Sequence, residues 1–376
     1  MLTLIAGVAA NGAQASAAST RSAGPSRATV LSTRAAAASA APDSTRYVTD
    51  GALAGVAAVS GGSAWAVGYT GTQEKSKTLI LHWNGKTWAK APGFTPVAGE
   101  LSGIAAVSAT SAWAVGYTGS PFTSQRTLLE HWNGRSWTAV TTPRPVSGAF
   151  AAVTATAGYA WAVGSTAAST AVIWHWNGRT WAKSPVPAGL SNVGLATVAA
   201  TSASSAWAGG LGTINTQISG LLLHWNGTSW AKAAYPIQGT YQYLNGLAAG
   251  PRGTAWAVGA NASGTGATAI SMYWNGTSWA KTTGPASGDL FAAAAVPGGT
   301  AWAVGSAESP KVAVASTVIA RWTGKAWSRV ASPTPSGDGA LAAVAATSAR
   351  GAWAVGSTGL SVPKTLILHW NGKAWS

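Results

Sequence analysis

The chain has 376 residues, of which 47% are hydrophobic and only 8% are charged, and its formal net charge is +15. It contains no cysteine, which excludes disulfide bonds, thiolate metal sites and cysteine nucleophiles. The small share of charged residues favours sheets that are buried on both faces.

The first 15 residues are predicted to be a signal peptide that lacks its true start. An apolar segment, 2–10, precedes Ala13-Gln14-Ala15, which is typical of a cleavage site, but no positively charged segment comes first. The alternative is an unstructured, alanine-rich N-terminus. The apolar segment is shorter than the ~20 residues that span a bilayer, so we expect a secreted, extracellular protein without a transmembrane anchor.

Residues 16–44 consist mainly of Ala, Ser, Thr and Arg. Because they cannot bury enough apolar surface to offset the entropy of the chain, we expect a flexible linker. Its arginines could touch an anionic surface, although a solvated linker explains them as well.

Residues 45–376 consist of seven repeats. Each repeat carries a first motif, Ala-Trp-Ala-Val-Gly or a variant of it, and then a second, His-Trp-Asn-Gly-x-x-Trp, which first occurs at residues 82–88. These motifs supply three tryptophans to each repeat and account for all of the 22 tryptophans except Trp174. The tryptophans of the first motif are Trp65, Trp113, Trp161, Trp207, Trp256, Trp302 and Trp353.

The second repeat predicts four strands, at residues 101–107, 112–117, 127–132 and 135–140. Four short strands in a period of roughly 40 to 50 residues are the signature of a β-propeller blade, and seven blades are enough to close a ring. We therefore predict an all-β, seven-bladed β-propeller with four antiparallel strands per blade. A β-solenoid is the alternative, but its periods are usually shorter and lack a repeated pair of hairpins.

The Asn-Gly pair of each second motif predicts a two-residue type I′ turn, because both residues tolerate positive φ. In that register Trp83 lies opposite Lys86, and Leu81 lies opposite Trp88. The sixth repeat has Thr323 in place of the asparagine, and a β-branched residue at positive φ is expected to cost on the order of 1 kcal/mol. The seventh repeat ends at Ser376, so its outer strand is short, and residues 47–49 are predicted to lie beside it and help to close the ring.

The connections between strands differ at the two ends of the predicted ring. Loops between strands one and two and between strands three and four are short and repetitive, whereas the other two kinds vary in length and content. Variable loops on a rigid scaffold are the usual place for recognition, so the end that carries them is the predicted binding surface. Aromatic residues with polar neighbours suit sugars or peptides. The candidates are Tyr69, Tyr117, Phe122, Arg126, Arg144, Tyr235, Tyr241, Tyr243, Glu308 and Lys311, although each could also simply cover a loop end.

Basic residues follow the Asn-Gly turns and the last tryptophans of most repeats, as a sparse belt rather than a patch. The belt could attract an acidic polysaccharide, but solubility explains it as well, and nucleic acid is not an expected partner. Five histidines share one strand-three position, which is typical of a repeated structural residue and not of a metal or acid–base site. We expect no cofactor, no metal and a monomer.

The pairing of Trp-Ala-Val-Gly with His-Trp-Asn-Gly-x-x-Trp resembles the tandem Trp-rich propeller repeats of secreted actinobacterial proteins. More distantly it resembles propellers with BNR repeats and those similar to photosystem assembly factors. The resemblance covers residues 47–376 and implies a propeller scaffold. The Asp-box of sialidase-like blades and the Gly-His and Trp-Asp pairs of WD40 blades are absent.

Three functions are compatible with these features. The first is a secreted or cell-surface, non-catalytic module that binds a glycan, such as a cell-wall polysaccharide, or a protein through the variable loops. The second is a carbohydrate-active hydrolase or lyase, which needs two carboxylates near the central channel from among Glu100, Asp289, Glu308 and Asp338. The third is a structural scaffold with no ligand.

Overall fold

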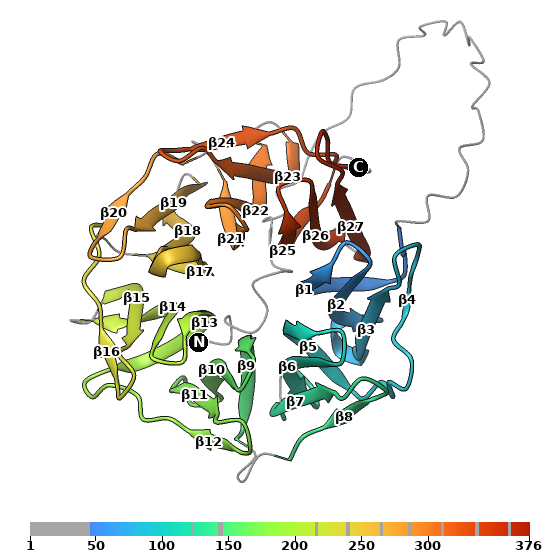
Figure 1. Ribbon diagram of the computed structural model, residues 1–376, viewed down its shortest axis with the longest axis horizontal. Helices are drawn as coiled ribbons and strands as arrows, with labels where there is room; N and C mark the ends of the chain where they lie inside the picture. The colour runs from blue at the N-terminus through green and yellow to red at the C-terminus, as the bar shows by residue number, and fades with distance from the viewer. Residues whose placement is uncertain are drawn as a thin grey trace, which may run out of the picture.

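The computed structural model describes residues 46–121, 124–141, 146–214, 217–237, 241–263, 266–284, 288–309, 312–334, 338–359 and 362–376. The predicted signal peptide, 1–15, and linker, 16–44, lie outside the described residues. The described part forms seven antiparallel sheets that stand around one axis (Figure 1). Six sheets have four strands and one has three, in sequence order across each sheet, which confirms the predicted seven-bladed propeller.

The first four blades each contain four strands. Blade one contains β1 (Gly51–Ser60), β2 (Ser63–Thr70), β3 (Lys77–Trp83) and β4 (Trp88–Lys90), with a 3-10 turn, η1 (Gln73–Lys75), before β3. Blade two contains β5 (Gly99–Ser108), β6 (Ser111–Thr118), β7 (Arg126–Trp132) and β8 (Trp137–Ala139). Blade three contains β9 (Gly148–Thr156), β10 (Tyr159–Thr166), β11 (Ala171–Trp176) and β12 (Trp181–Lys183). Blade four contains β13 (Ser191–Ser202), β14 (Ser205–Ile214), β15 (Gln217–Trp225) and β16 (Trp230–Lys232).

The remaining three blades follow the same order. Blade five contains β17 (Gln242–Ala249), β18 (Ala255–Ser263), β19 (Gly266–Trp274) and β20 (Trp279–Lys281), with η2 (Pro251–Gly253) between its first two strands. Blade six contains β21 (Asp289–Val296), β22 (Thr300–Ser309), β23 (Val312–Trp322) and β24 (Trp327–Val330). Blade seven contains β25 (Ala340–Ser348), β26 (Gly351–Thr358) and β27 (Lys364–Trp370). The first strand of each blade lies nearest the ring axis, and in the six four-stranded blades the fourth strand lies at the rim (Figure 1).

Tryptophans from adjacent blades interlock at each blade interface. Trp65 of blade one stacks on His82 of its own sheet, with ring centroids 4.1 Å apart. Its ring centroid also lies 5.0 Å from that of Trp132 and 5.3 Å from that of Trp137, both in blade two. The second-strand tryptophan therefore faces the next blade, and the tryptophans of strands three and four face the previous one. The edge-on contact with Trp137 is one of the arrangements that aromatic pairs prefer.

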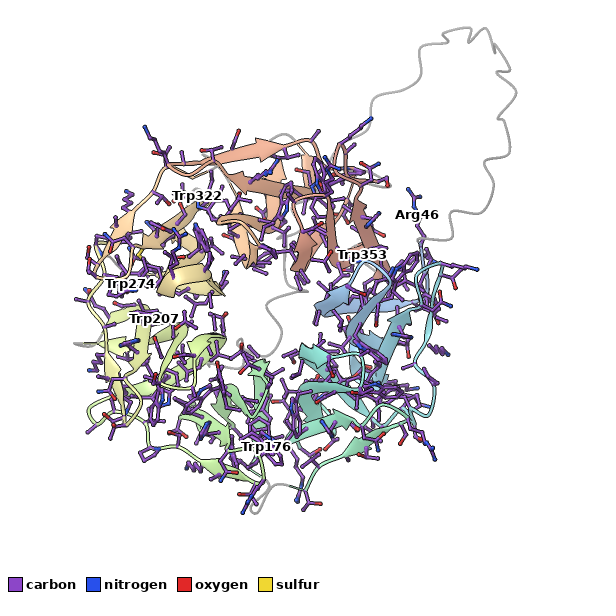
Figure 2. All side chains as sticks on the ribbon, viewed as in Figure 1. Arg46, Trp176, Trp207, Trp274, Trp322 and Trp353 are labelled. Carbon is purple, nitrogen blue, oxygen red and sulfur yellow. The ribbon has the colours of Figure 1, made fainter. Side chains whose placement is uncertain are left out.

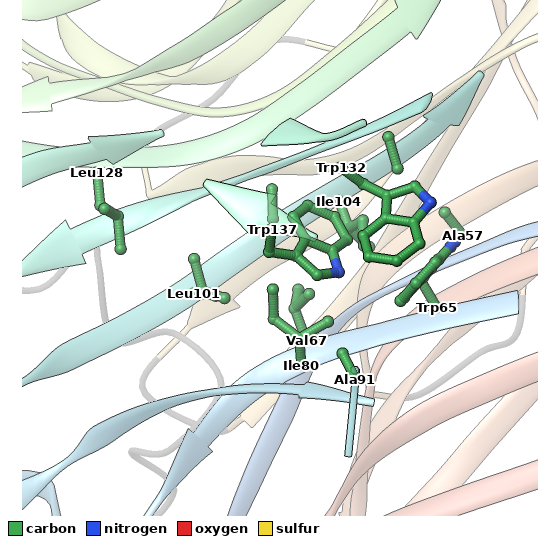
Figure 3. Close-up of a cluster of buried hydrophobic side chains, with 12 residues drawn as sticks. Ala57, Trp65, Val67, Ile80, Ala91, Leu101, Ile104, Leu128, Trp132 and Trp137 are labelled. Atoms are coloured by element: carbon green, nitrogen blue, oxygen red, sulfur yellow. The ribbon is translucent and has the colours of Figure 1, made fainter. Parts of the chain in front are cut away.

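The hydrophobic core is divided into seven clusters, one between each pair of neighbouring blades. Between blades one and two, for example, Val67 and Ile80 lie with Leu101, Leu128 and the rings already described (Figure 3). Each sheet is thus buried on both faces, as the low charge predicted. Face-to-face packing of neighbouring sheets holds the ring together.

The Asn-Gly turns differ from the predicted type I′ turn. Trp83 pairs with Trp88 across the ladder and Leu81 with Lys90, so the loop has four residues and the predicted register was wrong. Positive φ occurs at Gly85 but not at Asn84. The Asn84 side chain instead accepts hydrogen bonds from the backbone N–H groups of Lys86 and Thr87, each at 2.9 Å, as asparagine commonly does in turns. The same change of register starts the fourth strand of blade two at Trp137.

The expected strain at Thr323 is also wrong, because that position does not require positive φ. In this turn only Gly324 has positive φ. The Thr323 hydroxyl accepts a hydrogen bond from the Ala326 N–H at 3.3 Å and donates one to the Ala326 carbonyl at 2.8 Å. Threonine therefore replaces the acceptor that asparagine supplies in the other blades.

Four blades tie their third-strand tryptophan to the turn between strands one and two. The indole N–H of Trp83 donates to the Gly61 carbonyl at 3.1 Å, and that of Trp132 to the Ala109 carbonyl at 3.0 Å. Blades four and seven repeat this bond. In these four blades strand one has a register shift just before the turn, which blades three, five and six lack. The register shift adds one residue to strand one, and every blade with this additional residue also has the hydrogen bond from the indole N–H.

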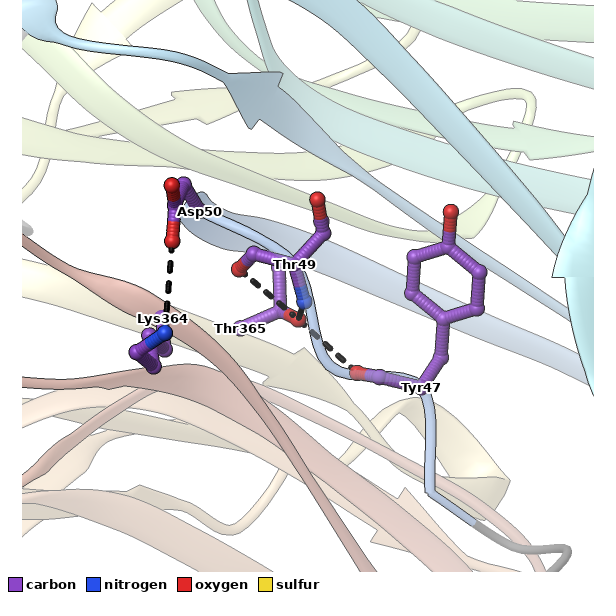
Figure 4. Close-up of polar contacts among 5 residues, drawn as sticks. All are labelled: Tyr47, Thr49, Asp50, Lys364 and Thr365. Atoms are coloured by element: carbon purple, nitrogen blue, oxygen red, sulfur yellow. Dashed lines mark hydrogen bonds and ion pairs between the residues drawn. The ribbon is translucent and has the colours of Figure 1, made fainter.

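The ring closes where residues 47–50 meet blade seven (Figure 4). The Thr365 N–H donates to the Thr49 carbonyl at 3.0 Å, and the Thr365 hydroxyl accepts from the Thr49 N–H at 3.0 Å and donates to the Tyr47 carbonyl at 2.8 Å. Lys364 and Asp50 form an exposed ion pair at 3.4 Å. The segment thus helps to close the ring, but its partner is the third strand, β27, and not the short outer edge at Trp375.

Within the described residues, no helix is long and apolar enough to cross a membrane.

Candidate functional site

The two kinds of connection lie at opposite ends of the ring, as the topology predicted. At one end the Trp83 indole reaches the turn at Gly61, which brings the Asn-Gly turn and the turn between strands one and two together. At the other end, Lys77 bridges to Ala98, just before the next blade's first strand. We call the second end the variable-loop face. Among its predicted residues, Phe122, Arg144 and Lys311 lie outside the described residues.

Tyr69 and Tyr117 lie beneath this face rather than on it, with exposed fractions of 5% and 1%. They join a polar network between blades one and two. Tyr117 and Ser76 each donate a side-chain hydrogen bond to Glu100, and Gln125 donates one to Tyr117. The Tyr69 hydroxyl is buried near Glu100 and has no hydrogen-bond partner among the described residues. As placed, these two rings support the loops and do not present a surface to a ligand.

The Glu100 carboxyl has an unusual proton affinity. Burial raises its pKa to about 7, and the hydrogen bonds from Tyr117 and Ser76 oppose that rise. Burial, and then the nearby Glu100, raises the pKa of Tyr69 to about 12. Glu100 therefore exchanges a proton near neutral pH at the inner edge of the variable-loop face. The sequence could not reveal this, because the raised pKa comes from burial, which depends on how the neighbouring blades pack around the side chain.

A second group of tyrosines, Tyr235, Tyr241 and Tyr243, lies where blade four leads into blade five. Tyr235 is half-buried, and its hydroxyl donates to the Gly220 carbonyl at 2.6 Å, so this residue holds the connection in place. Tyr243 is half-buried in β17, opposite Ala260. Tyr241 is 55% exposed. Of the three, Tyr241 offers the largest ring surface to a ligand.

The backbone of Tyr241 is in the left-handed conformation, with φ of 57°. Its N–H donates to the Ile218 carbonyl at 2.9 Å, the bond by which the first strand of every blade is joined to the third strand of the previous one. Five blades use glycine as this donor, and four of those glycines have positive φ. These residues are Gly51, Gly99, Gly148 and Gly288, with Gly339 as the fifth. In the strand pairing Gln242 occupies the position of these glycines, and Tyr241 comes one residue earlier, where blade four has Asn192 with φ of 48°. A bulky residue in this conformation costs roughly 1–2 kcal/mol.

Arg126 and Glu308 are exposed, and they belong to different blades. Glu308 lies close enough to Asp289 to raise the pKa of the Asp289 carboxyl, after the larger effect of burial. The Oδ1 atom of Asp289 is buried without a hydrogen-bond partner among the described residues. Asp289 and Glu308 are thus the two carboxylates of the variable-loop face that the structure brings near each other.

The histidines have the structural environment that their repetition predicted. His82 stacks on Trp65, and its Nε2 atom lies 3.3 Å from the Ser63 hydroxyl. His131 and His224 form the same bond with Ser111 and Ser205. Burial lowers the pKa of all five histidines. The described residues include no group of three histidine, aspartate or glutamate side chains that could hold a metal ion.

The fold and the repeats define a seven-bladed β-propeller with one uniform end and one variable end. No family model matches the chain, and no curated protein matches its sequence. The solved structure of YCF48 from Cyanidioschyzon merolae matches with 15% identity and a TM-score of 0.51, over 85% of this chain and 96% of that one. The PL25 ulvan lyase, a polysaccharide lyase, matches with 11% identity and a TM-score of 0.55, over 87% and 96%.

A third match is the GH74 xyloglucanase from Xanthomonas campestris, with 15% identity and a TM-score of 0.54 over 88% of this chain and 55% of that chain. At these identities the likenesses show the propeller fold alone. They agree with the predicted resemblance to propellers similar to photosystem assembly factors at the level of fold. The narrower resemblance to actinobacterial Trp-rich repeats stays a prediction from the motifs.

Proposed function

We propose that the protein is a secreted, non-catalytic binding module that recognises a glycan or a protein through the variable-loop face, with Tyr241 as a main contact. The observation that carries the proposal is the exposed ring of Tyr241, held in a left-handed backbone conformation at the residue whose N–H joins blade five to blade four. Backbone strain at a residue where glycine would be unstrained is commonly found at functional sites. An exposed aromatic ring suits stacking on a sugar or anchoring a peptide.

Structures of the same fold support both ligand classes. YCF48 has been solved bound to D1 peptide, with a TM-score of 0.50 to this chain, and the PL25 ulvan lyase has been solved bound to a glucuronic acid–rhamnose 3-sulfate glycan. These identities are 17% and 11%, so the ligands themselves do not transfer to this chain. Export to the outside of the cell is part of the proposal and is tested by finding the mature protein in the culture medium.

Replacing Tyr241 with glycine is expected to weaken binding and stabilise the fold at once. The ring contact is lost, whereas the left-handed backbone becomes free of strain, which should raise the free energy of unfolding by roughly 1 kcal/mol. The measurement is a binding screen of the repeat domain against wall polysaccharides and peptide libraries, followed by titration of each hit with Tyr241→Gly and by thermal unfolding of both proteins.

Tyr241→Phe is the matched control, because it keeps the ring and removes only the hydroxyl. It should retain most of the affinity if the ring stacks on the ligand. A Tyr241→Gly protein that binds every hit as tightly as the natural protein would refute the proposed contact. A screen with no hits would favour the structural scaffold.

A carbohydrate-active enzyme is the second candidate, and the proximity of Asp289 to Glu308 favours it. The raised pKa of Asp289 suits a proton donor, and Glu308 could act as the base or nucleophile. The test is incubation of the protein with each polysaccharide hit and assay for new reducing ends or unsaturated sugars. Turnover that Asp289→Asn abolishes would establish the enzyme and displace the non-catalytic proposal.

A further inference from the structure

We propose a second binding site, for a neutral sugar ring, in a hollow between blades two and three at the end opposite the variable-loop face. The hollow has a volume of about 350 Å³. Its lining includes Ser111, Trp113 and His131 from blade two, and Thr156, Gly158 and Trp176 from blade three. Figure 2 labels Trp176 at the boundary between these two sheets. The volume lies at the small end of the range for ligand pockets, which suits one or two sugar rings rather than a folded partner.

The hollow exists because blade three lacks the tie that closes the same place in other blades. Its turn, Ala157 and Gly158, has two residues as in the tied blades, but its first strand has no register shift before the turn, so the connection is one residue shorter. The Trp176 indole N–H consequently has no carbonyl to meet, and no described residue accepts its hydrogen bond. Trp176 is half-buried, as is the tied Trp225, so its ring is accessible from the hollow.

Blades five and six also lack the tie, but they have longer connections at this point. Blade five places the 3-10 turn η2 there. Blade six has Pro297, Gly298 and Gly299 between its first two strands. The interface between blades two and three also contains Trp174, the chain's one additional tryptophan, which is buried where blade one has Leu81. Among the described interfaces, only this one combines a short connection, a third-strand indole N–H without an acceptor and an additional tryptophan.

The chemistry of the lining suits an uncharged ring with one apolar face and several hydroxyl groups. The Trp176 ring lies 5.1 Å from that of Trp113, centroid to centroid, and supplies an aromatic wall. The Trp176 N–H and the Thr156 hydroxyl can hydrogen-bond to sugar hydroxyls. The Ser111 hydroxyl and the His131 ring lie within hydrogen-bond distance of each other, at 3.3 Å, and each can form a further hydrogen bond with a sugar hydroxyl. No acidic or basic side chain other than His131 lines the hollow, and burial lowers the pKa of His131, so that it is neutral at pH 7.

This site is independent of the proposed function, because Tyr241 and the variable loops lie at the other end of the ring. The experiment uses the full chain labelled with nitrogen-15 and a panel of methyl glycosides of neutral hexoses as probes. The indole N–H signal of Trp176 is identified by its absence from the Trp176→Phe spectrum. At least one glycoside should shift this signal in a saturable way, and Trp176→Phe should bind it about five- to tenfold more weakly, the loss expected for one hydrogen bond.

Trp225→Phe is the matched control, since Trp225 has the same position in blade four but donates to the Ala203 carbonyl at 3.2 Å. It should bind the glycoside normally. Thr156→Trp fills the rim of the hollow from an exposed position and should abolish binding without loss of thermal stability. The proposal is overturned if no neutral glycoside shifts the Trp176 signal, or if Thr156→Trp binds as well as the natural protein. Tyr241→Gly should leave this binding unchanged, so the two proposals fail separately.

Discussion

Replacing Glu130 with leucine is expected to stabilise the protein by about 3 kcal/mol at pH 8. Glu130 lies in β7 between Leu128 and Trp132, on the face that packs against blade one, and it is only 5% exposed. No hydrogen bond or ion pair joins its carboxyl to another described residue. Burial raises its pKa from 4.5 to about 7, and each pH unit corresponds to roughly 1.4 kcal/mol. Blades one, four and seven have leucine at this position, so the side chain fits.

The direction of the pH dependence follows from the raised pKa. The folded protein binds this proton more tightly than the unfolded chain, so the free-energy cost of ionising Glu130 is absent below about pH 4.5 and grows as the pH rises to about 7. The gain from Glu130→Leu over the natural protein should therefore shrink towards pH 4.5. Denaturant unfolding at pH 4.5, 6 and 8 measures it, with Glu130→Gln as a control that also removes the charge. A gain that does not depend on pH would contradict this account of Glu130.

Deleting residues 45–50 is expected to lower the free energy of unfolding by about 3 kcal/mol. The deletion removes the three hydrogen bonds between Thr365 and the segment at Tyr47 and Thr49, each worth about 1 kcal/mol net. It also removes Tyr47 from the edge of the cluster between blades seven and one. Thermal and denaturant unfolding measure the effect, and an unchanged melting curve would show that the segment does not close the ring.

A pair of threonines separates closure of the ring from the loss of hydrogen bonds alone. Thr78 of blade one bonds to Val97 through the same hydroxyl and backbone groups, at 2.9 and 3.3 Å, but about twenty residues of chain already join the two. Thr365→Val and Thr78→Val remove similar bonds. Thr365→Val should lower the melting temperature more, since of the two variants it alone loosens the contact between blade seven and the start of blade one.

The fold could be predicted because the sequence motifs that determine it repeat at a nearly constant spacing. Three tryptophans recur at fixed strand positions, and six of the seven interfaces between described blades repeat the same ring contacts, as Trp65 with Trp132 and Trp83 with Trp353 illustrate. The turn register could not be predicted from Asn84-Gly85 alone. The same pair of residues suits a two-residue turn with positive φ and a four-residue turn in which the asparagine side chain accepts hydrogen bonds.

The candidate site was predictable in outline but not in detail. The variable-loop face followed from strand order and loop length. Burial of Tyr69 and Tyr117 did not, because it depends on the neighbouring blade that covers their rings. Glu130 could have been found by aligning the repeats, which places it in the slot of Leu81, and the hollow beside Trp176 could not, because it depends on a missing register shift.

The central claim, that recognition belongs to the variable-loop face, is tested most directly by hydrogen–deuterium exchange with and without the best ligand from the binding screen. Exchange should slow in peptides that cover residues 233–244 and the adjoining strand connections at that end of the ring. The Asn-Gly turns at the opposite end should exchange at an unchanged rate. Protection confined to those turns, with none around Tyr241, would contradict the account.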